Sequence, residues 1–239
     1  MTIRAVALDL GNTLVEYYER EDFRPILSES IRHAHDAFSH FAGIDLEEAQ
    51  LIAASENHEH DDGKVRPLQD RFDRVFGLRD DTPSSVREQA GRAFLRPIFG
   101  RARKYEDTDL TLQALRDLGC KLAIVSNTPW GSPSEPWREE LRRLDLIDAT
   151  DVSIFCVDIG WRKPSPKIFA HVLAVLNVDP TECLFVGDEP VWDIGGALGA
   201  GMHAVLMDRT NRNTTYPGPK ITRLVEIIHF VQRSFCARR

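Results

Sequence analysis

The sequence predicts an α/β fold, with a doubly wound, mainly parallel sheet and an all-helical insert. Two observations support this prediction. Short apolar runs alternate with segments of helical periodicity through the second half of the chain. Between residues 15 and 103, by contrast, the pattern is helical throughout. Strands that alternate with helices form right-handed crossovers, and such crossovers build parallel sheets.

The first predicted strand is the apolar run at residues 5–8, which leads directly into Asp9. A continuous apolar run indicates a strand buried on both faces, as in a parallel sheet. Asp9 is then expected at the carboxyl edge of the sheet, where open α/β sheets bind ligands. An aspartate in this place can act as a nucleophile or a metal ligand, or it can simply cap the turn that follows.

Residues 15–103 form the predicted all-helical insert, called the helical insert below. Its predicted helices cover residues 23–41, a stretch after the N-cap Asp45, residues 68–76 and residues 86–99. Residues 1–14 and 104–239 are then the core domain. Because the helical insert leaves the core directly after the first strand, we expect it to lie over Asp9 like a lid.

The rest of the core follows the same alternation of strand and helix. Its further predicted strands cover residues 121–126, 152–156, 183–186 and 203–207. Its predicted helices cover residues 110–118, 136–144, 166–176, 194–200 and 221–230.

Composition narrows the possible partners. A net charge of −7 and a pI near 5.6 argue against a nucleic-acid-binding surface. No apolar run approaches the roughly 18 residues that a membrane span needs. The four cysteines are dispersed without CxxC spacing, and the N-terminus leads directly into the first strand instead of a signal peptide. We therefore expect a cytoplasmic protein with no nucleic-acid or membrane partner.

Polar residues follow four predicted strands at the point where each strand ends. These residues are Asp9, Ser126 with Asn127, Lys163, and Asp188 with Asp193. Since the carboxyl ends of parallel strands meet at one edge of the sheet, we expect the side chains to converge there.

Each of these groups has a role in phosphoryl transfer. Asp9 attacks phosphorus, Ser126 donates a hydrogen bond to a phosphate oxygen, and Lys163 neutralises charge on the other oxygens. A hard cation such as Mg²⁺ takes oxygen ligands, here from Asp9 and Asp188, with the backbone carbonyl of Gly11 as a third.

On these residues the chain resembles the haloacid dehalogenase-like (HAD) superfamily of hydrolases. The motifs, in family order, are Asp9-Leu10-Gly11-Asn12-Thr13, Ser126-Asn127, Lys163-Pro164, and Gly187-Asp188 with Asp193. The helical insert resembles the family's helical cap. The resemblance implies an aspartyl-phosphate on Asp9 and a phosphoryl group held by Ser126 and Lys163. It also implies Mg²⁺ anchored by Asp188 and Asp193, with Asp193 either a direct ligand or an orienting group.

Gly11 departs from the family's phosphatase pattern. Phosphatases of this family usually carry an aspartate at this position, which protonates the leaving group and then activates water. Glycine can do neither, and such catalysis is typically worth about two to four orders of magnitude. Asn12, Thr13 or a residue of the helical insert can replace the missing group, the substrate can have a good leaving group, or the activity can be residual. Phosphonate-cleaving, ATPase and dehalogenating relatives also lack this aspartate.

Three further residues are candidates for binding substrate. Asn127 either contacts substrate or shapes its loop. Arg162 adjoins Lys163 and can grip a second anionic group. Trp130 follows the Ser126 loop, where the alternative is packing between the helical insert and the core.

The first functional hypothesis is an Mg²⁺-dependent hydrolase of a small phosphorylated metabolite that works through an aspartyl-phosphate. The second is a metal-independent 2-haloacid dehalogenase, in which Asp9 attacks carbon. The third is a catalytically weak protein that binds a phosphorylated ligand. The sequence leaves the substrate open, and it is compatible with a monomer or a homodimer.

Overall fold

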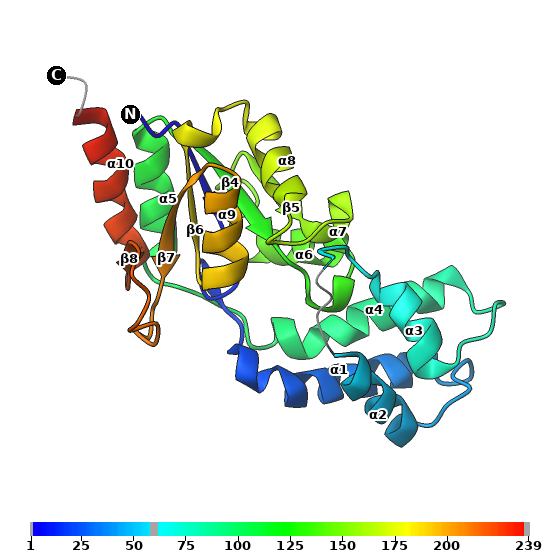
Figure 1. Cartoon of the computed structure of the whole chain (residues 1–239). Helices are drawn as coiled ribbons and strands as arrows, with labels where there is room; N and C mark the ends of the chain where they lie inside the picture. The colour runs from blue at the N-terminus through cyan, green and yellow to red at the C-terminus, as the bar shows by residue number, and fades with distance from the viewer. Residues whose placement is uncertain (1, 58–61, 237–239) are drawn as a thin grey trace.

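Six parallel strands form one sheet in the computed structural model, which describes residues 2–57 and 62–236. The strands are β1 (Ala5–Leu8), β4 (Lys121–Ser126), β5 (Val152–Phe155), β6 (Cys183–Gly187), β7 (His203–Met207) and β8 (Lys220–Ile221). Their order across the sheet is β5-β4-β1-β6-β7-β8, and every neighbouring pair is parallel. The central β1 pairs with β4 on one side and β6 on the other (Figure 1). The predicted doubly wound parallel sheet is confirmed.

Helices cover both faces of this sheet. They are α5 (Thr108–Asp117), α6 (Ser134–Arg143), α7 (Cys156–Ile159), α8 (Pro166–Leu176), α9 (Gly196–Gly199) and α10 (Ile227–Cys236). The shorter turns are η2 (Pro129–Gly131), η3 (Pro180–Glu182), η4 (Pro190–Gly195) and η5 (Leu224–Glu226).

Alternate residues of β1 point to opposite faces, because side chains alternate along a strand. Val6 and Leu8 belong to a core that includes residues of α5, α6 and α10. Ala5 and Ala7 belong to a second core, built with residues of α8 and α9. Both faces are therefore buried, which explains the continuous apolar run in the sequence.

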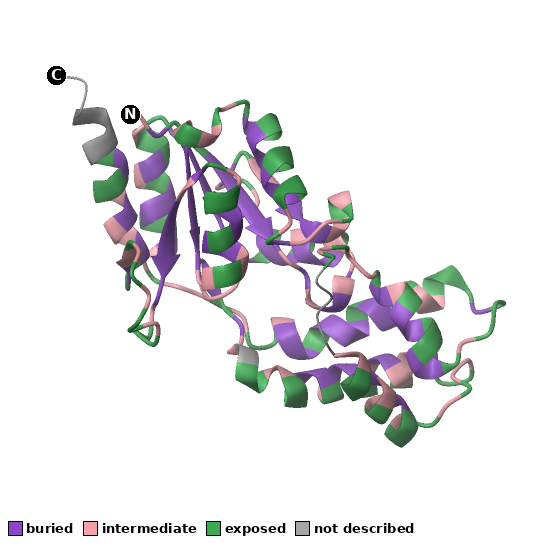
Figure 2. Ribbon diagram, in the orientation of Figure 1, coloured by how far each residue is buried: buried purple, intermediate pink, exposed green. Residues whose placement is uncertain are grey.

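The helical insert packs around its own aromatic core. Its helices are α1 (Phe23–Phe38), α2 (Leu46–Glu56), α3 (Leu68–Phe76) and α4 (Ser84–Phe99), after a short turn η1 (Arg20–Asp22). Phe38, Phe72, Phe76 and Phe94 are fully buried, with neighbouring ring centroids 5.1 to 5.9 Å apart. The buried stripes of these helices face one another (Figure 2).

Two short strands connect the helical insert to the core. β2 (Val15–Glu16) pairs antiparallel with β3 (Arg103–Lys104). The segment predicted to be all-helical therefore begins and ends with extended residues. The reason is that the outgoing and returning chains run side by side and pair through their backbone groups.

Three predicted elements differ from the structure. The strand predicted at 152–156 ends at Phe155, because Cys156 begins α7. The helix predicted at 194–200 begins earlier, as a π-helical turn over Pro190–Gly195. In the helix predicted at 221–230, Ile221 instead pairs with Met207 as part of β8, and α10 starts at Ile227. An apolar residue such as Ile221 fits a sheet edge and a helix equally well, so its pattern was ambiguous.

Among the residues that the structure describes, every helix is too short or too polar to cross a membrane. Cys120, Cys156 and Cys183 are buried free thiols. The side chain of Cys236 lies outside the described residues.

The core and the helical insert approach each other closely at Gly131. This residue has φ +66°, and a Cβ built there would lie 2.1 Å from the carbonyl oxygen of Arg66 in the insert. Gly119 has φ +79° but open space around it. Both positions would strain a larger residue, but only Gly131 also contacts the helical insert. Substitutions at the two glycines therefore distinguish the cost of backbone strain from the cost of that contact.

We expect Gly119→Ala to lower the free energy of unfolding by about 1–2 kcal/mol through left-handed backbone strain alone. Gly131→Ala is expected to cost about 2–5 kcal/mol, because the clash with the helical insert adds to the same strain. Urea denaturation of both variants measures the difference. Equal losses for the two variants would show that the close approach at Gly131 contributes nothing.

Candidate active site

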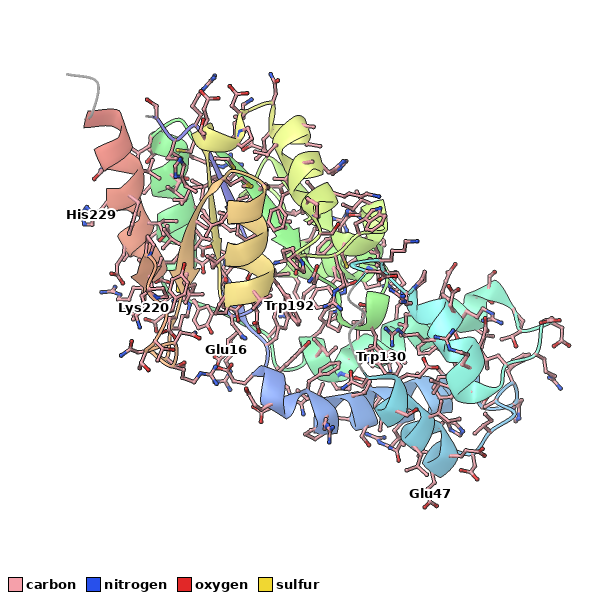
Figure 3. All side chains as sticks on the ribbon, in the orientation of Figure 1. Glu16, Glu47, Trp130, Trp192, Lys220 and His229 are labelled. Atoms are coloured by element: carbon pink, nitrogen blue, oxygen red, sulfur yellow. The ribbon has the colours of Figure 1, made fainter. Side chains whose placement is uncertain are left out.

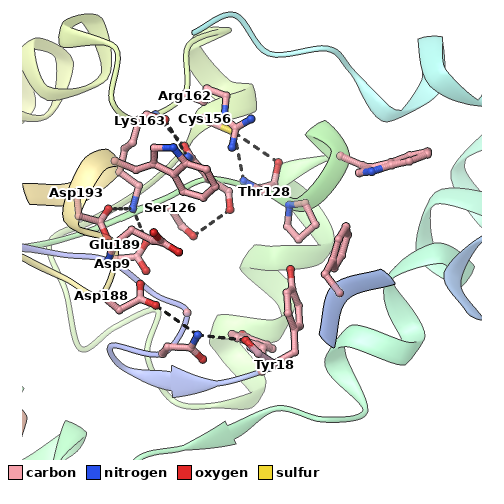
Figure 4. Close-up of a pocket in the computed structure, with 18 of the residues that line it drawn as sticks. Asp9, Tyr18, Ser126, Thr128, Cys156, Arg162, Lys163, Asp188, Glu189 and Asp193 are labelled. Atoms are coloured by element: carbon pink, nitrogen blue, oxygen red, sulfur yellow. Dashed lines mark hydrogen bonds and ion pairs between the residues drawn. The ribbon is translucent and has the colours of Figure 1, made fainter. Parts of the chain in front are cut away.

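A cavity of about 830 Å³ lies between the carboxyl edge of the sheet and the helical insert. The core lines it with Asp9, Lys163 and Asp188, and the insert with Lys64 and Arg71. The core side chains gather in one corner, as the close-up shows (Figure 4). The cavity therefore brings the sequence-predicted residues together and opposes them to cations of the insert.

Lys163 is the centre of the polar contacts. Its Nζ lies 2.5 Å from Oδ1 of Asp9 and 2.6 Å from Oδ1 of Asp193. All three side chains are less than a tenth exposed. The ammonium also lies 5.5 Å from the centroid of the Phe185 ring. Lys163 thus joins the end of β1 to η4 and holds Asp9 from the side.

The charges in this corner shift one another. Burial raises the pKa of Asp9 to about 7, which Lys163 opposes and Asp193 reinforces. Burial alone would lower the pKa of Lys163, but the carboxylates of Asp193 and Asp9 outweigh it and raise that pKa. Lys163 is therefore an ammonium, and it favours the ionised form of Asp9 that a nucleophile needs.

Asp188 completes an acidic cluster. Oxygens of Asp9, Asp188 and Asp193 all lie within 4.8 Å of one another. The pKa of Asp188 is raised well above its usual value by burial and by the nearby carboxylates, Asp9 first. Asn12 donates from Nδ2 to Oδ2 of Asp188 over 3.3 Å. Three carboxylates facing one lysine suit a hard divalent cation, whose preferred ligands are oxygens.

The carboxylate of Asp193 occupies the space that a side chain at Gly187 would fill. A Cβ at this position would lie 2.3 Å from Oδ2 of Asp193, so any larger residue would displace the carboxylate. The same Oδ2 accepts a hydrogen bond from the backbone N–H of Glu189, at 3.1 Å. The strand end and η4 thereby fix the position of Asp193.

Ser126 and Asn127 end the neighbouring strand β4. Ser126 is 7% exposed and lines the cavity. Asn127 donates from Nδ2 to the carbonyl oxygen of Lys163 over 3.1 Å and accepts from the backbone N–H of Lys163 over 2.9 Å. Both polar ends of Asn127 thus hold the main chain of Lys163, the contacts of a residue that shapes its loop.

Trp130 and Arg162 both line the cavity. The indole of Trp130 stacks on Phe94 of α4, and its Nε1 donates to Oδ1 of Asn57 over 3.1 Å. It lies where the core meets the helical insert (Figure 3), so its contacts are those of packing between the two. The guanidinium of Arg162 lies 5.0 Å from the ring centroid of Trp192.

Sequence reasoning missed Arg71, which also lines the cavity. A signal for it was present. On α3 the residues Leu68, Phe72 and Val75 form the buried stripe, and Arg71 falls within that stripe at the i+3 position. An arginine on the apolar face of a helix is unusual, because charged residues rarely become fully buried without a partner.

The family model for haloacid dehalogenase-like hydrolases matches residues 3–201. This chain belongs to that family. The match covers β1, the helical insert, and every motif that supported the resemblance. The predicted family and the prediction of a hydrolase are confirmed.

Relatives within the family differ in their chemistry. Glyceraldehyde 3-phosphate phosphatase of Pyrococcus abyssi is 31% identical over 206 residues, which are 85% of this chain and 80% of that protein. (S)-2-haloacid dehalogenase 1 of a Pseudomonas species is 36% identical over 141 residues, 59% of this chain and 57% of that one. A solved HAD phosphatase from Thermococcus onnurineus has a TM-score of 0.65 and 26% identity, covering 96% and 98% of the two chains.

Lys163→Met is expected to destabilise the protein in a pH-dependent way. In Mg²⁺-free buffer at pH 8 we expect a loss of about 3–5 kcal/mol in the free energy of unfolding, because Asp9 and Asp193 lose their counter-ion. The pKa of Asp9, about 7 in the folded protein, already lies above its usual 3.8, so ionising Asp9 costs folding energy as pH rises. Without Lys163 this pKa rises further.

The loss is therefore expected to be smaller at pH 5.5, where Asp9 is protonated. Urea denaturation at the two pH values measures it. Lys167→Met is the matched control, since Lys167 is exposed and lies against Trp161. Its loss should stay within about 1 kcal/mol at both pH values. Identical losses at pH 5.5 and pH 8 for Lys163→Met would contradict this account of the site.

Proposed function

We propose that this protein is an Mg²⁺-dependent phosphohydrolase of a small phosphorylated metabolite, and that Asp9 forms an aspartyl-phosphate. One observation carries the proposal: Asp9, Lys163, Asp188 and Asp193 converge in a buried corner of the cavity. The 31% identical relative that acts on glyceraldehyde 3-phosphate supports this class of substrate. A cytosolic location stays a prediction from the sequence.

The donor set fits Mg²⁺. The carboxylates of Asp9, Asp188 and Asp193 offer oxygens, and Lys163 neutralises only one of the three charges. Asp9 and Asp188 would hold the ion, with the carbonyl of Gly11 as a third ligand and Asp193 as a ligand or orienting group. When bound, Mg²⁺ supplies positive charge to the phosphoryl oxygens.

The chain's own residues account for the chemical steps. An oxygen of ionised Asp9 forms a bond to phosphorus while the bond from phosphorus to the leaving oxygen breaks. The Oγ–H of Ser126 and the ammonium of Lys163 stabilise the charge on the other phosphoryl oxygens. Water then attacks phosphorus while the bond between phosphorus and the Asp9 oxygen breaks, and phosphate leaves with the proton of the water, which restores the ionised Asp9. The helical insert roofs the cavity and limits the entry of other water molecules.

Asp9→Asn is expected to abolish turnover, since the amide cannot replace the carboxylate as a nucleophile. The assay is phosphate release from p-nitrophenyl phosphate and acetyl phosphate, with Mg²⁺ and with EDTA. Wild-type turnover should require Mg²⁺. Retention of full activity by Asp9→Asn would disprove the covalent mechanism.

Because residue 11 is a glycine, this position offers no side chain to protonate the leaving group. The space beside it is open, because a Cβ built there would meet only Cδ2 of Tyr17, at 3.9 Å. A Cβ is therefore accommodated at this position without a clash. The proposal accordingly favours substrates with good leaving groups, which need little protonation.

Gly11→Asp is expected to raise kcat/KM for glycerol 3-phosphate, whose leaving alcohol needs a proton, by at least about tenfold. Turnover of acetyl phosphate should change less than about threefold, since its leaving group needs no acid. Gly11→Asn is the matched control, with the same shape and no acid. An equal gain in Gly11→Asn, or no gain in Gly11→Asp, would show that the missing acid is not what limits this enzyme.

A second candidate is a metal-independent 2-haloacid dehalogenase. It is favoured by Gly11 and by the dehalogenase among the relatives, and opposed by the Asp188 and Asp193 pair. In this case halide release from 2-haloacids would be insensitive to EDTA. Mg²⁺ and ligand binding without turnover of any phosphate ester or haloacid would instead favour a phospho-ligand-binding protein.

A further inference from the structure

Arg71 is a charged residue buried in the wall of the cavity. It is only 8% exposed and lies on the apolar face of α3. It lines the same cavity as Asp9 and Lys163, but it comes from the helical insert. A buried guanidinium is costly unless it is paired and hydrogen-bonded.

The protein supplies only part of that pairing. Nη1 of Arg71 donates to the carbonyl oxygen of Glu56 over 3.0 Å, while Nε is buried and has no partner among the described residues. The carboxylate of Glu56 is held instead by Arg74, with contacts of 2.7 and 3.0 Å. Arg71 and Arg74 thus both interact with the charge of Glu56, and it is the exposed Arg74 that donates hydrogen bonds to the carboxylate.

Arg71 lies over the ring of Trp130. The guanidinium carbon lies 4.9 Å from the ring centroid of Trp130. Trp130 is in turn held by Asn57 and Phe94 of the insert. A guanidinium that lies over an indole can still donate its unpaired N–H groups to a planar anion.

Trp130 also connects this arginine to the phosphoryl site. It lies four residues after Ser126, on the loop that follows β4. Arg71 therefore lies at the insert end of that loop and Ser126 at the sheet end. A ligand held at both ends spans the cavity from the sheet edge to the helical insert.

We propose that Arg71, which lies over the ring of Trp130, forms a second anion subsite, so that the substrate carries an anionic group remote from its phosphoryl group. The shared chemistry is that of a carboxylate or a second phosphate. This inference rests on the proposed function and narrows its substrate class. It also gives Nε of Arg71 an acceptor that the described residues do not supply.

Two matched pairs of compounds test the subsite. In the first pair, glyceraldehyde 3-phosphate carries an aldehyde where 3-phosphoglycerate carries a carboxylate. Fructose 6-phosphate and fructose 1,6-bisphosphate differ in one added phosphate. The wild-type enzyme is expected to prefer the more anionic member of one pair, and the pair in which it does so identifies the anion as carboxylate or phosphate.

Arg71→Met is expected to lower kcat/KM for the preferred compound by about 10- to 100-fold, the effect of losing hydrogen bonds to a charged group. For its less anionic partner the change should stay within about threefold. Arg71→Lys keeps the charge but loses the planar guanidinium, so its kcat/KM for the preferred compound should lie between those of the wild type and Arg71→Met. Arg87→Met is the matched control, an arginine of the insert that is paired with Asp73 away from the cavity.

A purely structural role for Arg71 gives a different result. Arg71→Met would then lower the unfolding temperature and reduce kcat/KM equally for both members of each pair, which would overturn the subsite. The same holds if the wild-type enzyme shows no preference in either pair.

Failure of the proposed function is measured separately. If neither these compounds nor p-nitrophenyl phosphate nor acetyl phosphate is hydrolysed, the hydrolase proposal fails. Calorimetric binding of the four compounds to Asp9→Asn, with and without Arg71→Met, then decides the subsite. Binding weakened about tenfold or more by Arg71→Met supports it. Equal binding, or no binding of any of the four, contradicts it.

Discussion

The buried ammonium of Lys163 is the interaction on which the site depends. It lies within 2.6 Å of carboxylates from the end of β1 and from η4, so it joins segments far apart in the sequence. Without it, Asp9, Asp188 and Asp193 would repel one another in a poorly solvated corner. Asn127 supports the arrangement by binding the main chain of Lys163 on both sides. The same contact that stabilises the sheet edge thus favours an ionised Asp9.

The cavity places unlike charges at its two ends. Carboxylates gather at the sheet edge, where a divalent cation fits, and arginines project from the side of the helical insert. Such a division suits a ligand that carries negative charge along its length, because each end then finds a positive partner. Trp130 belongs to the core loop after β4 yet packs on Asn57 and Phe94 of the insert, so this side chain joins the two parts of the chain beside the cavity. Under the proposed function, the core would supply the reacting groups and the helical insert would bind the remote end of the substrate.

Gly11 and Gly187 show how a missing side chain can matter in opposite ways. At position 187 the absence is required, because a Cβ would meet the carboxylate of Asp193. At position 11, by contrast, a Cβ would make only an ordinary van der Waals contact with Tyr17. In the proposed mechanism the absence of an acid at this position favours substrates whose leaving groups depart without protonation. The family sets the type of reaction, and these two positions set how this member can perform it.

The sequence by itself determined the fold class, the family motifs and the identity of the groups at the strand ends. These are local signals, because buried parallel strands are continuously apolar and polar residues mark where they end. The tertiary structure decided what the groups do to one another. Asn127 bonds to Lys163 across 36 positions, and Ile221 joins the sheet because Met207 offers it an edge. Arg71 enters the site only because α3 packs against the Trp130 loop. Such contacts depend on distances between segments, which residue patterns along one chain do not encode.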